Sequence, residues 1–215
     1  MFDELNALGI DSGRPLLISD ADEVLFAFME GFEGFLNSRG LSFSWASFRL
    51  NGNIIDHRTG EAVEPAAVRP LIYSFFENHT RSIAAVDGAA ESLQHLGRHL
   101  QIVVLSNIWP EFREARAHAL RSQGMPYPVI ANRGSKAPAV AHLASLTCGP
   151  VFFVDDIPEH HRDVANLAGD VIRIHYVANR RLADLLGPAT NCHHHARDWP
   201  GICSYIEACL GVGPS

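Results

Sequence analysis

PLLISDADEVL, residues 15–25, joins a short apolar run to a pair of acidic side chains. The run Leu16–Ser19 is typical of a buried strand in a parallel sheet. Asp20 and Asp22 follow at its carboxyl end, the edge where open α/β sheets bind their ligands. Carboxylates two residues apart on extended chain point the same way and repel, so the pair favours a divalent cation with oxygen ligands. Taken alone, the pair fits a solvated turn equally well, because Asp is common in turns.

Two further apolar runs end in polar residues of a similar kind. Residues 100–105 and 151–154 both have the composition of buried strands. A lysine lies between them in the sequence and precedes a predicted helix. An ordered set of such residues, each at the end of a strand or the start of a helix, indicates one site rather than separate turns. The members of this set are Ser106, Asn107, Lys136, Asp155 and Asp156.

Taken in order, these residues resemble the four motifs of the haloacid dehalogenase superfamily, in particular its phosphatase branch. Asp20-Ala21-Asp22 is similar to the first motif and Leu105-Ser106-Asn107 to the second. Lys136 corresponds to the third motif, and Val154-Asp155-Asp156 to the fourth. The resemblance covers residues 15–210. Two positions depart from the pattern: Glu23 stands where many members have Gly, and Ala137 where relatives with this kind of cap often have Pro.

The spacing of the strands predicts an insertion. The interval between Val24 and Val86 is much longer than a strand-helix-strand crossover requires. Helices are predicted from Val24 to about Gly40 and from about Pro65 to about Thr80, with aromatic side chains that mostly pack inward. The resemblance implies an α/β fold, with a Rossmann-like three-layer parallel-sheet core at residues 1–24 and 86–215. It also implies a small, mostly helical cap domain at residues 25–85.

The resemblance further implies a Mg²⁺-dependent phosphohydrolase acting on a small phosphorylated metabolite. Asp20 would be the nucleophile that forms an aspartyl-phosphate, and Asp22 the general acid and then the general base. Ser106, with Asn107 beside it, would donate hydrogen bonds to the phosphoryl group. Lys136 would balance the charge of the transition state. The implied Mg²⁺ ligands are Asp20, Asp22, Asp155 and Asp156, with the choice between the last two left open.

Two other readings remain. A 2-haloacid dehalogenase would share the fold and the Asp20 nucleophile, but it would need neither a metal nor the acidic residues Asp22, Asp155 and Asp156. A non-catalytic binding or regulatory protein with this fold would usually have lost one of the key positions, and all of them are present here. A Ser-His-Asp hydrolase is disfavoured because Gly-x-Ser-x-Gly does not occur, and neither a Walker loop nor a dinucleotide-binding glycine fingerprint is found.

The composition of the chain limits the kinds of molecule that it is expected to bind. The chain has 215 residues, 47% of them hydrophobic, and a net charge of -7, which argues against general binding of nucleic acid. No run is long enough to span a membrane and no signal peptide is visible, so a cytoplasmic location is expected. The sequence does not indicate the oligomeric state. Reduced, mostly buried thiols are expected of the cysteines, which are Cys148, Cys192, Cys203 and Cys209.

Two histidine-rich segments are weaker candidates. His193, His194 and His195 are consecutive, whereas zinc ligands are spaced, so a surface or strand segment is favoured over a metal site. His160 and His161 follow the second acidic pair closely. A solvated helix start is favoured for them over a place beside the metal.

Overall fold

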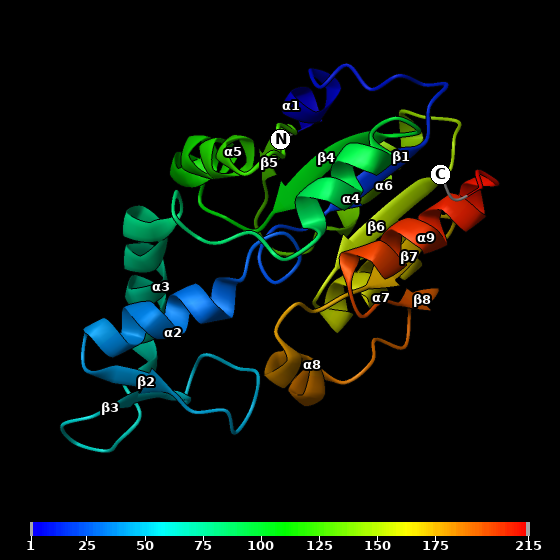
Figure 1. Cartoon of the computed structure of the whole chain (residues 1–215). Coiled ribbons are helices and arrows are strands. Elements are labelled where there is room, and N and C mark those ends of the chain that lie inside the picture. Colours follow the sequence, from blue (N-terminus) through cyan, green and yellow to red (C-terminus); the bar gives the residue numbers. More distant parts are fainter. Residues whose placement is uncertain (1, 214–215) are drawn as a thin grey trace.

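A parallel β-sheet forms the centre of the molecule, and a computed structural model describes it over residues 2–213 (Figure 1). The strand order is β5-β4-β1-β6-β7-β8, and the neighbouring strands pair in parallel. This arrangement confirms the predicted α/β fold with a Rossmann-like core. The strands are β1 (Leu16–Ser19), β4 (Gln101–Ser106), β5 (Val129–Ala131), β6 (Val151–Asp155), β7 (Ile172–His175) and β8 (His194–His195).

Helices cover both faces of the sheet (Figure 1). Side chains of β1 alternate between two buried clusters: Leu17 packs in the cluster of α4, α5 and α9, and Leu16 and Ile18 pack in the cluster of α1, α6 and α7. The sheet is therefore the middle of three layers, as predicted. The helices are α1 (Phe2–Asn6), α4 (Ala89–Leu96), the short 3₁₀ helix η1 (Pro110–Phe112), α5 (Arg113–Ser122), α6 (Ala137–Ser145), α7 (Pro158–Leu167), α8 (Arg180–Leu186) and α9 (Trp199–Leu210).

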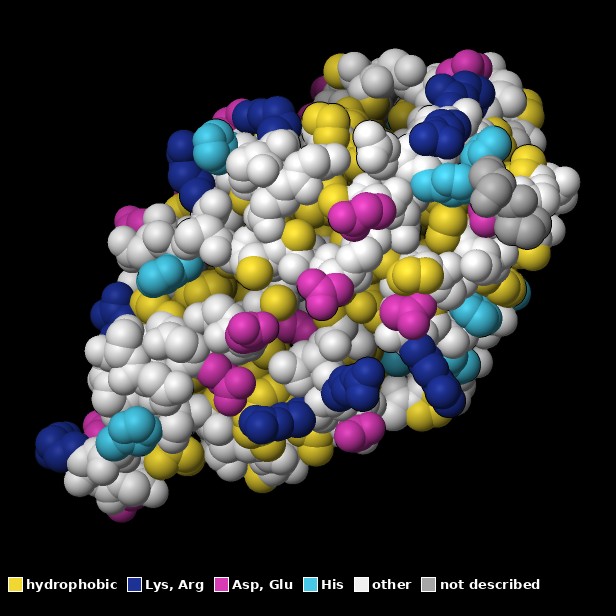
Figure 2. Space-filling model, in the orientation of Figure 1, with side chains coloured by type: hydrophobic (Ala, Val, Ile, Leu, Met, Phe, Trp, Pro, Cys, Tyr) yellow, Lys and Arg dark blue, Asp and Glu magenta, His cyan; other side chains and the backbone are white. Residues whose placement is uncertain are grey.

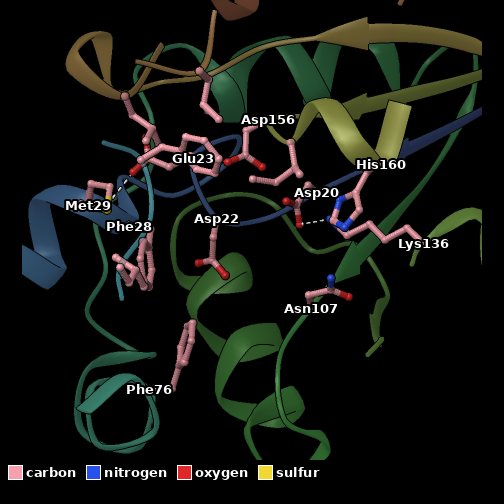
Figure 3. A pocket seen from close by; sticks show the side chains of 15 residues that line it. Asp20, Asp22, Glu23, Phe28, Met29, Phe76, Asn107, Lys136, Asp156 and His160 are labelled. Atoms are coloured by element: carbon pink, nitrogen blue, oxygen red, sulfur yellow. Dashed lines mark hydrogen bonds and ion pairs between the residues drawn. The ribbon is translucent and has the colours of Figure 1, made fainter. Parts of the chain in front are cut away.

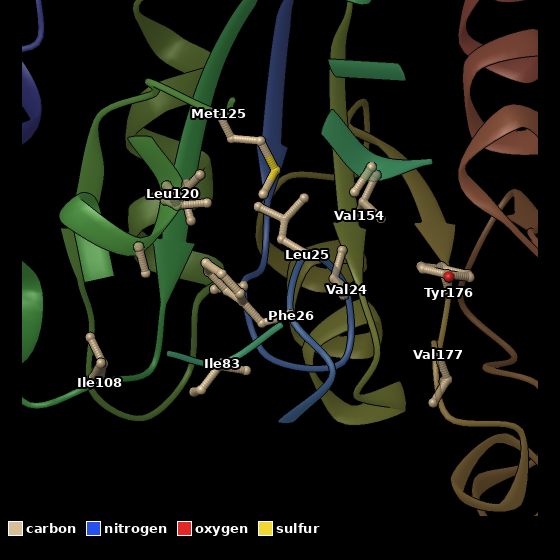
Figure 4. Close-up of a cluster of buried hydrophobic side chains, with 14 of the residues drawn as sticks. Val24, Leu25, Phe26, Ile83, Ile108, Leu120, Met125, Val154, Tyr176 and Val177 are labelled. Atoms are coloured by element: carbon tan, nitrogen blue, oxygen red, sulfur yellow. The ribbon is translucent and has the colours of Figure 1, made fainter. Parts of the chain in front are cut away.

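The loop after β1 is fixed by the core. Val24, Leu25 and Phe26 are fully buried among side chains of the α4–α5–α9 layer (Figure 4). The indole N–H of Trp199 donates to the carbonyl of Val24 at 2.8 Å, which ties the loop to the first turn of α9. Because burial of such large side chains is worth about 1.5–3 kcal/mol each, the loop that carries Asp20 is held rigidly.

The helix predicted from Val24 begins later, at Phe28. Residues 21–26 instead form a tight turn in which the amides of Leu25 and Phe26 both donate to the carbonyl of Ala21. Val24 and Leu25 have the spacing of a helix face, but their burial comes from this turn. The prediction of a helix start at Val24 is therefore wrong, while the helix near 65–80 is confirmed as α3.

The segment that runs from α2 to α3, residues 28–79, forms a lobe beside the sheet (Figure 1). Two helices and an antiparallel hairpin make it up, and aromatic rings join the helices. The ring of Phe75 lies 5.4 Å from those of Phe28 and Phe32, centroid to centroid. Its helices and strands are α2 (Phe28–Ser38), β2 (Leu41–Phe43), β3 (Ile54–Asp56) and α3 (Pro65–His79).

The charge and exposure of the surface side chains can be compared with the predictions about nucleic acid, membranes and cysteines. On the face shown in Figure 2, the basic side chains are arginines, which are scattered among Asp, Glu and His and form no continuous stripe. Within residues 2–213, no helix has both the length and the apolar character needed to cross a bilayer. All four cysteines are free thiols, but none is fully buried: Cys148 and Cys209 are exposed, and Cys192 and Cys203 are partly exposed. The expectation of mostly buried cysteines is therefore wrong.

Candidate active site

The carboxyl ends of β1, β4 and β6 bring the predicted residues together. β1 lies between β4 and β6, and Ser19 pairs with Val104 on one side and Val154 on the other. The residues that follow these positions therefore meet at one edge of the sheet. Figure 3 shows Asp20, Lys136, Asn107 and Asp156 around the resulting cavity.

Lys136 joins two of the acidic residues. Its Nζ lies 2.6 Å from Oδ1 of Asp20 and 2.7 Å from Oδ2 of Asp155. It is fully buried and is the only lysine of the sequence. Burial lowers the pKa of this ammonium, but the attraction of Asp155 and Asp20 outweighs burial and raises the pKa above its usual value. Lys136 is therefore a permanent cation at the base of the site.

The carboxylates exceed the charge that Lys136 can balance. Oxygens of Asp20, Asp155 and Asp156 lie within 4.8 Å of one another. Burial, followed by repulsion from Asp20 and Asp155, raises the pKa of Asp156 well above its usual value. Asp155 differs, because Lys136 and His160 outweigh its burial and hold its pKa below the usual value. A buried, all-oxygen group with excess negative charge fits a hard divalent cation such as Mg²⁺.

Asp155 has less freedom than Asp156 to bind a cation. Oδ2 of Asp155 accepts from Lys136, and Oδ1 accepts from the backbone N–H of Ile157 and contacts His160 Nδ1, both at 2.9 Å. No hydrogen bond to the Asp156 carboxylate occurs among the described residues. Asp156 is thus the more available direct ligand.

Ser106 ends β4, the strand that pairs with β1, and Asn107 follows it. The Ser106 hydroxyl is fully buried and has no hydrogen-bond partner within the described residues. A buried hydroxyl without a partner is costly, and a bound oxyanion would satisfy it. Asn107 is held by the loop after β5: its Oδ1 accepts from Asn132 at 2.7 Å, and its Nδ2 donates to the carbonyl of Gly134 at 3.0 Å.

Asp22 is held by an arginine that the sequence did not single out. Nη2 of Arg116, on α5, donates to both carboxylate oxygens of Asp22 at 2.7 and 2.9 Å. Arg116 is fully buried, and its guanidinium lies 4.9 Å from the ring centre of Phe26 and 5.5 Å from that of Phe76. Asp22 consequently points toward Phe76 rather than toward Asp156 (Figure 3).

Glu23 has a backbone conformation that glycine adopts more readily than other residues. Its backbone φ of 58° lies in the left-handed region, which disfavours side chains. The buried carboxylate offsets this cost by accepting from the backbone N–H groups of Met29 at 2.6 Å and Asn179 at 2.8 Å. It thereby joins the loop after β1 to α2 and to the segment before α8. Burial raises the pKa of Glu23 to about 7.

The interpretation of His160 and His161 as a solvated helix start is wrong. His160 lines the cavity and contacts Asp155, and His161 is fully buried. The ring of His161 bonds the Asp155 carbonyl at 3.0 Å, and burial lowers its pKa to about 4. α7 begins directly after the acidic pair, so its first turn faces the site, and this proximity in sequence was the available signal.

The residues of the triple-histidine segment are not among those that line the cavity. His194 and His195 form β8, which agrees with the predicted strand, and His194 stacks on Tyr205 with ring centres 4.1 Å apart. No metal-ligand group within residues 2–213 includes this segment. A second such group comprises His95, His99 and Glu207, and the 2.7 Å contact of His95 with Glu207 links α4 to α9.

A cavity of about 260 Å³ opens above the acidic group. It lies between the sheet edge, the inserted lobe and α8 (Figure 3). Asp20, Asp22, Lys136 and Asn107 line it, together with apolar side chains of the lobe and of α8. The arrangement can hold a small molecule with one end beside the carboxylates.

Comparisons with known proteins concern the fold. No protein-family model and no curated protein sequence matches the chain. A haloacid dehalogenase (HAD) family hydrolase from Deinococcus radiodurans R1, solved with phosphate and sodium, is 15% identical with a TM-score of 0.61, covering 95% of this chain and 100% of that one. A haloacid dehalogenase-like hydrolase from Streptococcus pneumoniae is 8% identical with a TM-score of 0.62, covering 91% and 99%.

A third solved structure is CbbY from Rhodobacter sphaeroides in complex with xylulose-(1,5)bisphosphate. It is 15% identical with a TM-score of 0.52, covering 86% of this chain and 94% of that one. Together these likenesses establish that the chain has the haloacid dehalogenase-like fold, as its motifs predicted.

Proposed function

We propose that this protein is a Mg²⁺-dependent phosphohydrolase that acts on a small phosphorylated metabolite. The observation that carries the proposal is the meeting of Asp20, Asp155 and Asp156 with the buried Lys136 at one end of a cavity. The solved structures of similar fold with bound phosphate and a bound bisphosphate support it.

Asp20 is the proposed nucleophile. Its Oδ1 accepts from Lys136 and from the backbone N–H of Ala21 at 2.7 Å, and no described group bonds Oδ2. Oδ2 is therefore the oxygen that attacks phosphorus and forms the aspartyl-phosphate. Ser106 and Lys136 would stabilise the charge on the phosphoryl oxygens, with Asn107 positioned beside them.

Asp22 is the proposed general acid, protonating the leaving oxygen, and then the base that activates water. In this structure, both of its oxygens bond Arg116. Proton transfer to a phosphoryl group on Asp20 therefore requires the Asp22 carboxylate to turn from Arg116 toward Asp20. The lobe at residues 25–85 carries Phe76 beside this pair, and we propose that it is a cap whose movement accompanies the turn.

Asp20 and Asp156, with the backbone carbonyl of Asp22, would hold Mg²⁺, and Asp155 would contribute directly or through water. When bound, the ion neutralises charge on the phosphoryl group. The free thiols of all four cysteines are consistent with the proposed cytoplasmic location, where thiols stay reduced.

The direct test is release of phosphate from 4-nitrophenyl phosphate with Mg²⁺, with EDTA, and with Ca²⁺. Activity should vanish in EDTA and return with Mg²⁺, and Ca²⁺ should substitute poorly because its larger, looser coordination misplaces the reacting groups. Asp20→Asn should be inactive and form no phosphoenzyme. Full turnover in EDTA would overturn the proposal and favour the dehalogenase alternative, and phosphoenzyme in Asp20→Asn would remove the assigned nucleophile.

A further inference from the structure

The cavity has two chemically different ends. The carboxylates and Lys136 lie at the sheet edge, and the remainder of the wall is largely apolar (Figure 3). The lobe and α8 supply this apolar wall, which we define by the side chains of Phe28, Phe48, Leu50, Phe76, Leu182 and Leu186. A phosphoryl group at the polar end would leave the rest of its substrate against hydrocarbon and aromatic rings.

Charge in the cavity disfavours a second anionic group on the substrate. Among the described residues that line the cavity, Lys136 is the only Lys or Arg, and Asp20 and Asp155 already bond it. The acidic side chains that line the cavity beyond Asp20 and Asp156 are Asp22, which Arg116 bonds, and Glu23. A carboxylate or second phosphate beside the apolar wall would therefore find no Lys or Arg side chain, among the described residues of the cavity, that is free to bond it.

Hydroxyl-rich substrates are disfavoured for a different reason. A buried hydroxyl needs a hydrogen-bond partner, and the apolar wall offers none along its side chains. The volume of about 260 Å³ is also below the roughly 300–1,000 Å³ typical of sites for drug-sized ligands, so the occupant is small.

We propose that the substrate is a phosphate monoester of a small, uncharged, apolar alcohol, whose hydrocarbon part packs on the apolar wall. The proposal rests on the phosphohydrolase function above and specifies its substrate class. In the reaction, an Asp20 oxygen forms a bond to phosphorus as the ester P–O bond breaks. The leaving alkoxide takes a proton from Asp22. Asp22 then takes a proton from water, whose oxygen bonds phosphorus as the bond from phosphorus to Asp20 breaks; this restores both aspartates, so the products are the alcohol and inorganic phosphate.

A pair of arginines near the cavity suggests the alternative substrate class, which carries a second anionic group. Arg69 and Arg133 lie near the ring of Trp109, at 6.0 and 5.9 Å from its centre, in a hollow that shares Asn107 with the cavity. A substrate with a second anionic group could extend past Asn107 to these arginines. The two classes differ in the charge at the far end of the substrate, so a panel of substrates separates them.

The panel consists of hexyl phosphate, glycerol 3-phosphate and 2-phosphoglycolate, assayed for kcat/KM with Mg²⁺. Acetyl phosphate, which is small and needs little contact with the wall, reports phosphohydrolase activity itself. We expect hexyl phosphate to exceed glycerol 3-phosphate by at least about tenfold, since single methylene differences in apolar pockets change kcat/KM by roughly 10–200-fold. Turnover of acetyl phosphate without this preference would overturn the substrate class alone. Failure with every compound, acetyl phosphate included, would overturn the phosphohydrolase function as well.

A substitution in the apolar wall, compared with a substitution elsewhere, tests whether the wall determines the substrate preference. Phe48 is 38% exposed, so Phe48→Ala removes wall contact with little effect on the core. It should lower the ratio of hexyl phosphate to glycerol 3-phosphate roughly tenfold. Phe2→Ala, at a residue 47% exposed on α1, is the control and should leave the ratio unchanged. An unchanged ratio in Phe48→Ala, or a preference for 2-phosphoglycolate that Arg133→Gln abolishes, would contradict the apolar assignment.

Discussion

Replacing Lys136 by methionine tests how far its charge stabilises the two buried carboxylates that it contacts. Lys136→Met keeps the length and apolar stem of the side chain but removes the charge that lies 2.6 and 2.7 Å from two buried carboxylates. Removing one partner of a buried ion pair typically costs about 3–5 kcal/mol, because the remaining charge is left without compensation. For a chain of this size each kcal/mol lowers the melting temperature by about 2–4 °C, so a fall of about 6–20 °C is expected.

Thermal unfolding, followed by circular dichroism with EDTA or with Mg²⁺, measures this effect. Mg²⁺ should raise the melting temperature of Lys136→Met more than that of the parent protein, because the cation then supplies the only strong compensation. Arg113→Met is the control: it removes a half-exposed ion pair with Glu4, and such pairs are worth about 0–1 kcal/mol. A Lys136→Met protein that melts in EDTA no lower than Arg113→Met would refute the reasoning.

Three further predictions address neighbouring groups. Asp22→Asn keeps the nucleophile but lacks the base for hydrolysis, so with an aryl phosphate it should accumulate a phosphoenzyme detectable by mass spectrometry, and a phosphate found on residue 22 in the parent protein would reverse the roles. Burial lowers the pKa of His161 from 6.5 to about 4, so its contribution to stability is present above pH 6.5 and lost as pH falls toward 4; in urea titrations His161→Gln should flatten this fall by up to about 3 kcal/mol, and equal slopes would contradict it. Amine acylation should spare Lys136 in the native protein and modify it in urea, and native modification would contradict its burial.

The sequence alone was sufficient to predict the fold and to identify the residues that gather at the strand ends. Asp20, Ser106 and Asp155 are far apart in the chain, yet each follows or ends an apolar run of the same parallel sheet. The carboxyl ends of neighbouring parallel strands share one edge, so the runs predict the meeting of these side chains. Their catalytic roles remain predictions, as does the assignment of residues 25–85 to a cap.

Other residues of the site could not be predicted, because no local sequence pattern marks them. Arg116 lies 94 residues from Asp22, and nothing in the pattern of α5 distinguishes it from a solvated arginine. The sequence pattern gave no sign of α8, although Leu182 and Leu186 line the cavity. The helix start was misplaced because the buried residues Val24 and Leu25 imitate helical periodicity inside a turn. These features depend on tertiary packing, which a single sequence does not specify locally.

The balance of charge connects these features. Asp20, Asp22, Asp155 and Asp156 gather at one edge of the sheet, and among the described residues Lys136 and Arg116 are the Lys and Arg side chains that bond them. Each cation is fully buried and bonded to carboxylates, so neither is free to bind the distal part of a substrate. The residual negative charge favours a divalent cation at the sheet edge, and the same charge excludes further anions from the cavity above it. The apolar wall therefore faces the part of the substrate for which the site has no remaining positive charge.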